Sequence, residues 1–142
     1  MPQPEDMRVG NKYYRFASSV GTRQSQVGGG WWIDYESFNT IETYSRRNAV
    51  RLPDAARLFL ALPYEWSRLD RLVSAILEVP LRAYAGRGKV ASTRSDKWTP
   101  VQHIQVKQLY VPGLYREGAT PQLFERAFPH PRFEYLATRQ KI

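Results

Sequence analysis

The chain has 142 residues, 42% of them hydrophobic, with 21 lysines and arginines against 13 aspartates and glutamates, and a net charge of +8. A chain of this length buries roughly 68–70% of its unfolded surface, so one domain over 1–142 is predicted. The absence of cysteine excludes disulfides, thiolate metal sites and thiol nucleophiles. His103 and His130 leave few candidates for a metal site or a Ser-His-Asp triad, and we expect no metal.

The positive charge is concentrated in the C-terminal part of the sequence. Residues 1–81 carry ten basic and nine acidic side chains, whereas residues 82–142 carry eleven and four. This asymmetry favours an anionic partner. The N-terminal sequence lacks the apolar stretch of a Sec signal peptide, and no apolar run is long enough to span a membrane. We therefore expect a protein made in a cytoplasm, with no membrane partner.

The first third of the chain predicts one strand and one helix. Residues 1–11 are predicted to form a loose N-terminal segment, and the aromatic run Lys12–Ala17 predicts a strand. The polar segment 18–30, which ends in three glycines, predicts a loop. Asp34 is a suitable N-cap for a helix over Tyr35–Asn48 with its apolar residues on one face.

Two further helices are predicted before a run of strands. Pro53 suits a first helical turn, and the apolar stretch after it predicts a helix to Leu62. Over Tyr64–Val79 apolar residues recur at helical spacing and predict a longer helix that ends at Pro80, with a core-facing stripe of Trp66, Leu69, Leu72, Val73, Ile76 and Leu77.

The second half of the sequence is dominated by strand signals. Leu81–Ala85 predicts a strand that enters a glycine-containing turn, and Val101–Val111 predicts a longer strand. A short helix from Thr120 to Phe128 and a last strand over Arg132–Ala137 follow. Because helices and strands do not alternate regularly, we expect an α+β fold with an antiparallel sheet.

Common cofactor and hydrolase motifs are absent, including the Walker A sequence, GxGxxG, HExxH and GxSxG. What remains is an ordered set of short pieces, Tyr14-Arg15-Phe16, Gly29-Gly30-Trp31-Trp32, Leu60-Ala61-Leu62-Pro63-Tyr64-Glu65-Trp66, Ala83-Tyr84-Ala85-Gly86-Arg87-Gly88 and Gln108-Leu109-Tyr110-Val111-Pro112. In this order, over residues 13–114, the chain resembles the NAD-processing, ADP-ribosyltransferase-like domains of bacterial polymorphic toxins.

This resemblance implies a compact split antiparallel sheet with NAD, as substrate, in the cleft between its halves. Arg15 would match the family's arginine that grips the dinucleotide phosphates, since a guanidinium suits bidentate phosphate contact. Trp31, Trp32 and Tyr84 would stack on nicotinamide or adenine. Arg87, in the glycine-containing turn after the predicted strand Leu81–Ala85, is also assigned to cofactor binding.

The catalytic position is where the sequence departs from the family. Gln108 lies where the transferases typically have a glutamate, which stabilises the developing oxocarbenium charge. The strand VQHIQVKQLYV contains no carboxylate, and the nearest acidic residue is Glu117. Either glutamine serves instead, or Glu117 folds back, or catalysis is lost. The resemblance thus implies an NAD glycohydrolase or ADP-ribosyltransferase acting as a toxin, delivered by a specialised secretion system, with an immunity or antitoxin protein as a partner.

The residues also allow plainer interpretations. Arg15 is one of sixteen arginines and could be an ordinary edge-strand residue. In a strand, Trp31 and Trp32 would face opposite ways, and one would belong to the core. Gln108 shares a face with apolar residues, which requires a buried partner or marks a cleft.

A different class of function is nucleic-acid binding. The segment 82–116 has seven basic residues against one acidic residue and interleaves them with Tyr84, Trp98, Tyr110 and Tyr115, the mixture of a stacking platform with phosphate contacts. A basic nucleic-acid-binding module without catalytic activity is therefore one alternative. A structural subunit of a larger assembly is another.

Overall fold

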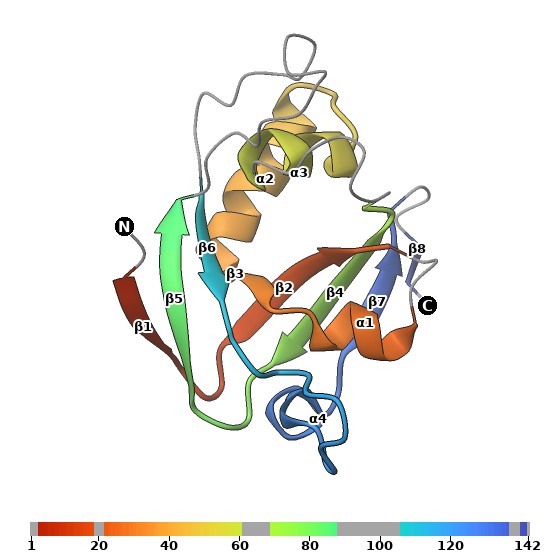
Figure 1. The fold of residues 1–142 in the computed structure, drawn as a ribbon. Coiled ribbons are helices and arrows are strands. Elements are labelled where there is room, and N and C mark those ends of the chain that lie inside the picture. The colour runs from red at the N-terminus through yellow and green to blue at the C-terminus, as the bar shows by residue number, and fades with distance from the viewer. Residues whose placement is uncertain (1–2, 19–21, 61–68, 88–105, 137–139, 142) are drawn as a thin grey trace, which may run out of the picture.

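The computed structural model describes residues 3–18, 22–60, 69–87, 106–136 and 140–141, and in these ranges the fold is α+β (Figure 1). Eight strands form an antiparallel sheet in the order β1-β5-β6-β3-β2-β4-β7-β8. The strands are β1 Gln3–Met7, β2 Lys12–Ala17, β3 Trp31–Asp34, β4 Arg71–Ile76, β5 Leu81–Arg87, β6 Lys107–Tyr110, β7 Arg132–Tyr135 and β8 Gln140–Lys141. The helices are α1 Arg23–Gly28, α2 Tyr35–Arg47, α3 Leu52–Leu60 and α4 Leu123–Ala127.

Strand β3 joins the two halves of the sheet. Its first residues, Trp31 and Trp32, pair with β6, whereas Ile33 and Asp34 pair with β2. Since the β2 partner of Ile33 is Tyr14, the two strands separate beyond that pair. Figure 1 shows the consequence, with β1, β5 and β6 on one side and β4, β7 and β8 on the other.

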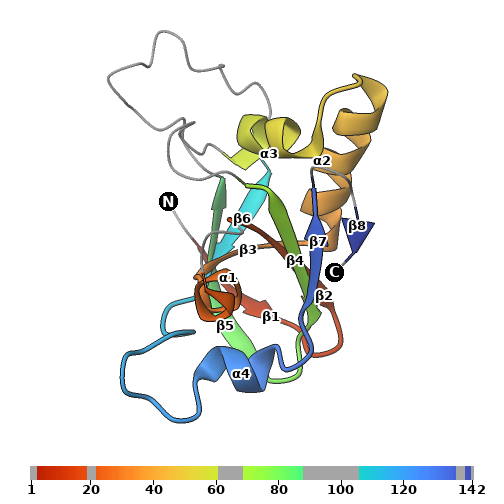
Figure 2. The same cartoon turned by 90° about the vertical axis from the view of Figure 1, so that its right-hand side faces the viewer.

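Two hydrophobic cores lie on the two faces of the sheet. We call the inner face the side that packs against α1 and α4, where the fully buried residues include Trp32, Val73, Leu109, Val27 and Phe128. We call the outer face the side that packs against α2 and α3, where the buried residues include Tyr14, Phe16, Ile33, Ile41 and Phe59. Figures 1 and 2 place α2 and α3 at one end of the molecule and α4 at the other.

The start of α2 is fixed by the residue that the sequence predicts. Asp34 Oδ1 accepts a hydrogen bond from Ser37 N at 2.8 Å, which satisfies a free amide of the first turn. Its other carboxylate oxygen lies 3.3 Å from Lys107 Nζ, which also contacts Glu5 at 2.8 Å. Burial acts to lower the pKa of Lys107, but Glu5 and Asp34 outweigh that effect and leave the pKa raised. These charges link β1, β3 and β6.

The predicted helix over Tyr64–Val79 is wrong in its described part. Residues 71–76 form β4, the partner of β2 and β7. Val73 and Leu77 are buried as expected, whereas Ile76 is 53% exposed. Leu69 is buried with a φ of 49°, a left-handed conformation that is incompatible with a continuing right-handed helix. Trp66 lies outside the described residues.

Two loop predictions are also wrong. The segment 1–11 contains β1, an edge strand in which Pro4 is tolerated because only one side of the strand needs hydrogen bonds. The segment 18–30 contains α1, whose N-cap Thr22 accepts from Ser25 N. Both segments are polar, and neither has the hydrophobic periodicity that indicates an element.

The other element predictions agree with the described residues. The predicted strand Lys12–Ala17 and the predicted strand from Leu81 are confirmed. Three predicted helices are confirmed as α2, α3 and α4, and their described ends differ from the predicted ends by three residues or fewer. The predicted strand Val101–Val111 is confirmed over Lys107–Tyr110, and its first residues lie outside the described ranges.

Candidate functional site

Arg15 lies where β2 and β3 separate. Its neighbours Tyr14 and Phe16 face the outer core, so strand alternation directs Arg15 to the inner face. There its Nε donates to the carbonyl of Gln26 at 3.1 Å, and its NH1 donates to the carbonyl of Trp31 at 3.0 Å. The guanidinium therefore connects β2 to α1 and to the first residue of β3.

Glycine at position 29 is required by the close approach of this guanidinium. A Cβ atom on Gly29 would overlap the terminal atoms of the Arg15 side chain. The carbonyl of Gly29 also accepts from Trp32 Nε1 at 2.9 Å, which holds the glycine segment against the sheet. Gly29 thus gives the arginine its space.

Arg71 on β4 is the second arginine of this region. Ala17 pairs directly with Arg71, so Arg15 is the diagonal neighbour of Arg71 on the same face, about 7–8 Å away along the sheet. Arg71 NH1 donates to the side-chain oxygen of Gln26 at 3.2 Å, and its guanidinium lies 4.9 Å from the ring centre of Tyr135. Gln26 is 4% exposed and therefore lies between the two arginines as a buried polar link.

We call Arg15, Gln26 and Arg71 the arginine cluster. Both arginines are half-buried, and no described carboxylate lies within ion-pair distance of either one. Burial lowers the pKa of Arg15 to about 10, because a guanidinium removed from water is less stable in its charged form. Arg71 Nε is buried and has no hydrogen-bond partner among the described residues. The cluster therefore carries two positive charges on one face of the sheet, the charge that an anion would complement.

Gln108 projects from the opposite face of the sheet. Its neighbour Leu109 belongs to the inner core, whereas Gln108 Nε2 donates to the carbonyl of Leu60, the last residue of α3, at 3.1 Å. Gln108 is 8% exposed. The buried partner that the sequence requires for this glutamine is therefore a helix end, and the structure does not bring Gln108 to Arg15.

The other predicted site residues are distributed over several surfaces. Trp32 is 1% exposed and stacks on Phe128 in the inner core, with ring centres 4.3 Å apart. Trp31 and Tyr84 are 55% and 46% exposed on the outer face. Arg87 pairs through its backbone with Lys107 at the end of β5. The two tryptophans thus face opposite ways, as strand alternation predicts.

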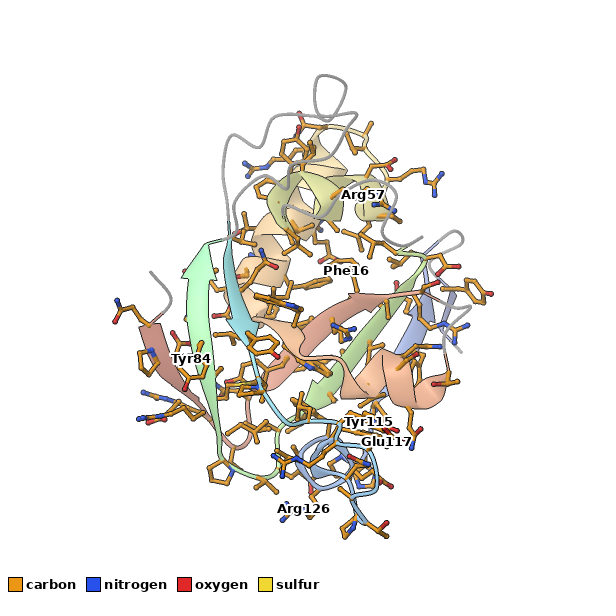
Figure 3. All side chains as sticks on the ribbon, in the orientation of Figure 1. Phe16, Arg57, Tyr84, Tyr115, Glu117 and Arg126 are labelled. Carbon is orange, nitrogen blue, oxygen red and sulfur yellow. The ribbon has the colours of Figure 1, made fainter. Side chains whose placement is uncertain are left out.

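Glu117 lies far along the molecule from Gln108. It is exposed in the segment between β6 and α4, and Figure 3 shows it beside α4, whereas α3 and its contact with Gln108 lie at the other end. A cavity of about 330 Å³ between α1 and α4 is lined by none of the predicted site residues. Glu117 does not fold back to Gln108 in this structure.

Two members of the arginine cluster were not predicted from the sequence. Arg71 falls within the predicted helix Tyr64–Val79, which is wrong, and Gln26 falls within the predicted loop 18–30, which is also wrong. A period-two interpretation of Arg71–Ile76, with Val73 and Ala75 on the face of Arg71, would have placed this arginine beside Arg15. Gln26 carries no comparable signal.

Comparisons with known proteins give no further assignment. No protein-family model matches the chain, no curated protein matches it, and no solved structure matches its fold. Among the described residues, no group of histidine and acidic side chains is placed to hold a metal ion. No helix within the described ranges has the length and apolar character needed to cross a membrane.

Proposed function

We propose that the chain is an NAD-processing domain that binds the diphosphate of NAD at the arginine cluster. The observation that carries this proposal is a pair of half-buried arginines, Arg15 and Arg71, with no described carboxylate to neutralise them. Partly buried cations without a counterion are costly, and two of them on one face also repel each other. A ligand that carries two adjacent phosphates relieves both costs.

The geometry of the cluster favours a diphosphate over a single carboxylate. Guanidinium groups bind phosphate through paired N–H donors, and each arginine can contact one phosphate. Gln26 fixes the two side chains relative to each other, because its backbone carbonyl accepts from Arg15 and its side-chain oxygen accepts from Arg71. Binding of the anion raises the pKa of Arg15 back towards its ordinary value, since the opposite charge stabilises the protonated form.

Processing of NAD requires cleavage of the bond between nicotinamide and ribose. In glycohydrolysis water replaces nicotinamide at the ribose carbon, and in transfer a group on the target does so. Electrostatic stabilisation of the oxocarbenium-like transition state is the main demand on the protein. Gln108, on the opposite face of the sheet, and Glu117, beside α4, lie away from the arginine cluster, so neither is assigned to this step, and the cluster is proposed for ligand binding alone.

Calorimetric titration tests the binding step. NAD and ADP-ribose are expected to bind saturably, and adenosine, which lacks the diphosphate, is expected to bind at least tenfold more weakly. In Arg71→Gln the dissociation constant for NAD should rise about tenfold or more, because one charge-assisted contact is lost. The control is Arg126→Gln, which alters an exposed arginine in the last turn of α4 and should leave NAD binding unchanged (Figure 3).

Nicotinamide release tests the processing step. Purified protein incubated with NAD, alone and with a cell lysate, is expected to release nicotinamide, and Arg71→Gln should slow that release at subsaturating NAD. Saturable binding without release in either condition would limit the function to binding. Equal binding of adenosine and NAD would contradict the diphosphate site itself.

A further inference from the structure

Three exposed aromatic side chains form a row across the outer face of the sheet. Trp31 on β3 pairs with Tyr110 on β6, and Tyr110 pairs with Tyr84 on β5. Directly opposed residues in a ladder lie on the same face, so the three rings belong to neighbouring strands on one surface. We call Trp31, Tyr110 and Tyr84 the aromatic row. Figure 3 shows Tyr84 over β1 and β5, away from α2 and α3.

The aromatic row is accessible along its whole length. The exposed fractions are 55% for Trp31, 40% for Tyr110 and 46% for Tyr84. The ring centres of Trp31 and Tyr110 lie 5.0 Å apart at 49°, so the two rings support each other while leaving faces open. Adjacent exposed aromatic residues on a folded domain usually mark an interaction surface.

The local backbone positions the central ring. A Cβ atom on Gly30 would lie 2.8 Å from the Tyr110 ring and 3.0 Å from the carbonyl of Val111. Glycine therefore allows the ring to lie close over the backbone at the start of β3. The hydrogen bond from Val111 N to the carbonyl of Gly30, 2.8 Å long, holds the two segments together.

Charge identifies the kind of partner. The chain carries a net charge of +8. Two copies of such a chain repel each other, whereas a polyanion is attracted. On the outer face beside Tyr84, Arg82 lies 3.3 Å from Asp6, and both side chains remain mostly exposed.

We propose that the aromatic row binds single-stranded nucleic acid by base stacking, on a surface distinct from the arginine cluster. Strands in a sheet are about 4.8 Å apart, so rings on neighbouring strands can hold successive unpaired bases. The net positive charge of the chain attracts the phosphates without selecting a sequence. A duplex keeps its bases inside the helix and cannot use the rings.

Fluorescence anisotropy with labelled twelve-nucleotide oligo(dT) and oligo(U) tests this surface. The affinity should fall steeply between 50 and 200 mM salt, by about 300-fold if six phosphates of a single strand are neutralised. Tyr84→Ala and Trp31→Ala should each weaken binding by about tenfold, the loss of one base–aromatic stack, whereas Tyr84→Phe should remain within about twofold of wild type. Circular dichroism should show unchanged folding, because these side chains are exposed.

The control variant is Tyr35→Ala, which removes an aromatic side chain that is 60% exposed but lies outside the row. Its oligonucleotide affinity should equal that of wild type. Three results would overturn the proposal: equal affinity for duplex and single strand, equal losses in Tyr35→Ala and Tyr84→Ala, or absence of oligonucleotide binding. The NAD titration is independent of these results, since none of the variants alters the side chains of the arginine cluster.

Discussion

Tyr14 is the residue whose ionisation is most directly tied to packing in the outer core. Its ring stacks on Phe38 with centres 4.2 Å apart and an interplanar angle of 4°. Burial raises the pKa of Tyr14, and the neighbouring Tyr35 and Glu42 raise it further. The phenol therefore stays protonated in the folded state at pH values where an unfolded tyrosine ionises.

This raised pKa makes stability depend on pH in the alkaline range. The contribution of Tyr14 is fully present below pH 10, its unfolded pKa, and is lost as the pH rises through the higher folded pKa. Relative to Tyr14→Phe, the wild-type free energy of unfolding should be constant from pH 7 to about 9 and should fall above about pH 10. Urea unfolding of both proteins measures the difference, and a constant difference up to pH 11 would contradict this assignment.

Single residues also show how far the sequence could predict the site. Arg15 could be singled out because one arginine interrupts an aromatic strand. Its partners could not be found, since they are backbone carbonyls of Gln26 and Trp31, and every residue has such a carbonyl. For Gln108 the sequence predicts either a buried partner or a cleft, and the structure supplies the partner at Leu60.

At the scale of elements, the turn between α1 and β3 controls the position of the Arg15 guanidinium. Gly29→Ala should displace this side chain, because the added methyl group would occupy its place. We expect a loss of stability of about 1–3 kcal/mol, typical of overpacking, and weaker NAD binding. Thermal unfolding and NAD titration provide the two measurements.

Gly28→Ala is the matched control for that prediction. Its Cβ atom would lie 3.2 Å from Phe124 and from Tyr115, a tight contact that does not involve the arginine. This variant should therefore bind NAD as wild type does. If both glycine variants lose NAD affinity equally, the close contact between Gly29 and Arg15 does not determine NAD binding.

The elements that the sequence predicted correctly have one clear hydrophobic period. The elements that were predicted wrongly have either an ambiguous hydrophobic period or none. Leu69, Val73 and Leu77 are four residues apart, a spacing that fits one face of a helix and, being even, also fits one face of a strand. Tertiary pairing with β2 and β7 decides in favour of β4. The edge strand β1 buries Met7 alone, so its sequence carries almost no signal.

At the scale of the whole molecule, the two cores share one sheet. Ile41 is fully buried in the outer core and Leu109 in the inner core. Since β3 contributes to both cores, we expect loss of either one to unfold the whole domain. Ile41→Ala and Leu109→Ala should each cost about 2–5 kcal/mol. In each variant, circular dichroism and tryptophan fluorescence should give one coincident transition, and separate transitions would indicate two independent units.

The sequence predicts an antiparallel sheet, but it does not predict that the candidate site residues lie on the two opposite faces of that sheet. Strand alternation places Arg15 on the inner face, and Trp31 and Tyr84 on the outer face. Sequence order alone cannot assign these faces, because it does not reveal that β3 exchanges one partner strand for the other. The resulting molecule has the arginine cluster and the aromatic row on opposite sides of one sheet.

³¹P NMR observes the diphosphate of NAD directly and therefore tests its proposed binding to the arginine cluster. With wild-type protein the NAD phosphorus resonances should shift and broaden saturably. Arg71→Gln should reduce the effect strongly, whereas Arg126→Gln should preserve it. Unchanged resonances at high protein concentration, or an equal response in wild type and Arg71→Gln, would contradict the assignment of the diphosphate to Arg15 and Arg71.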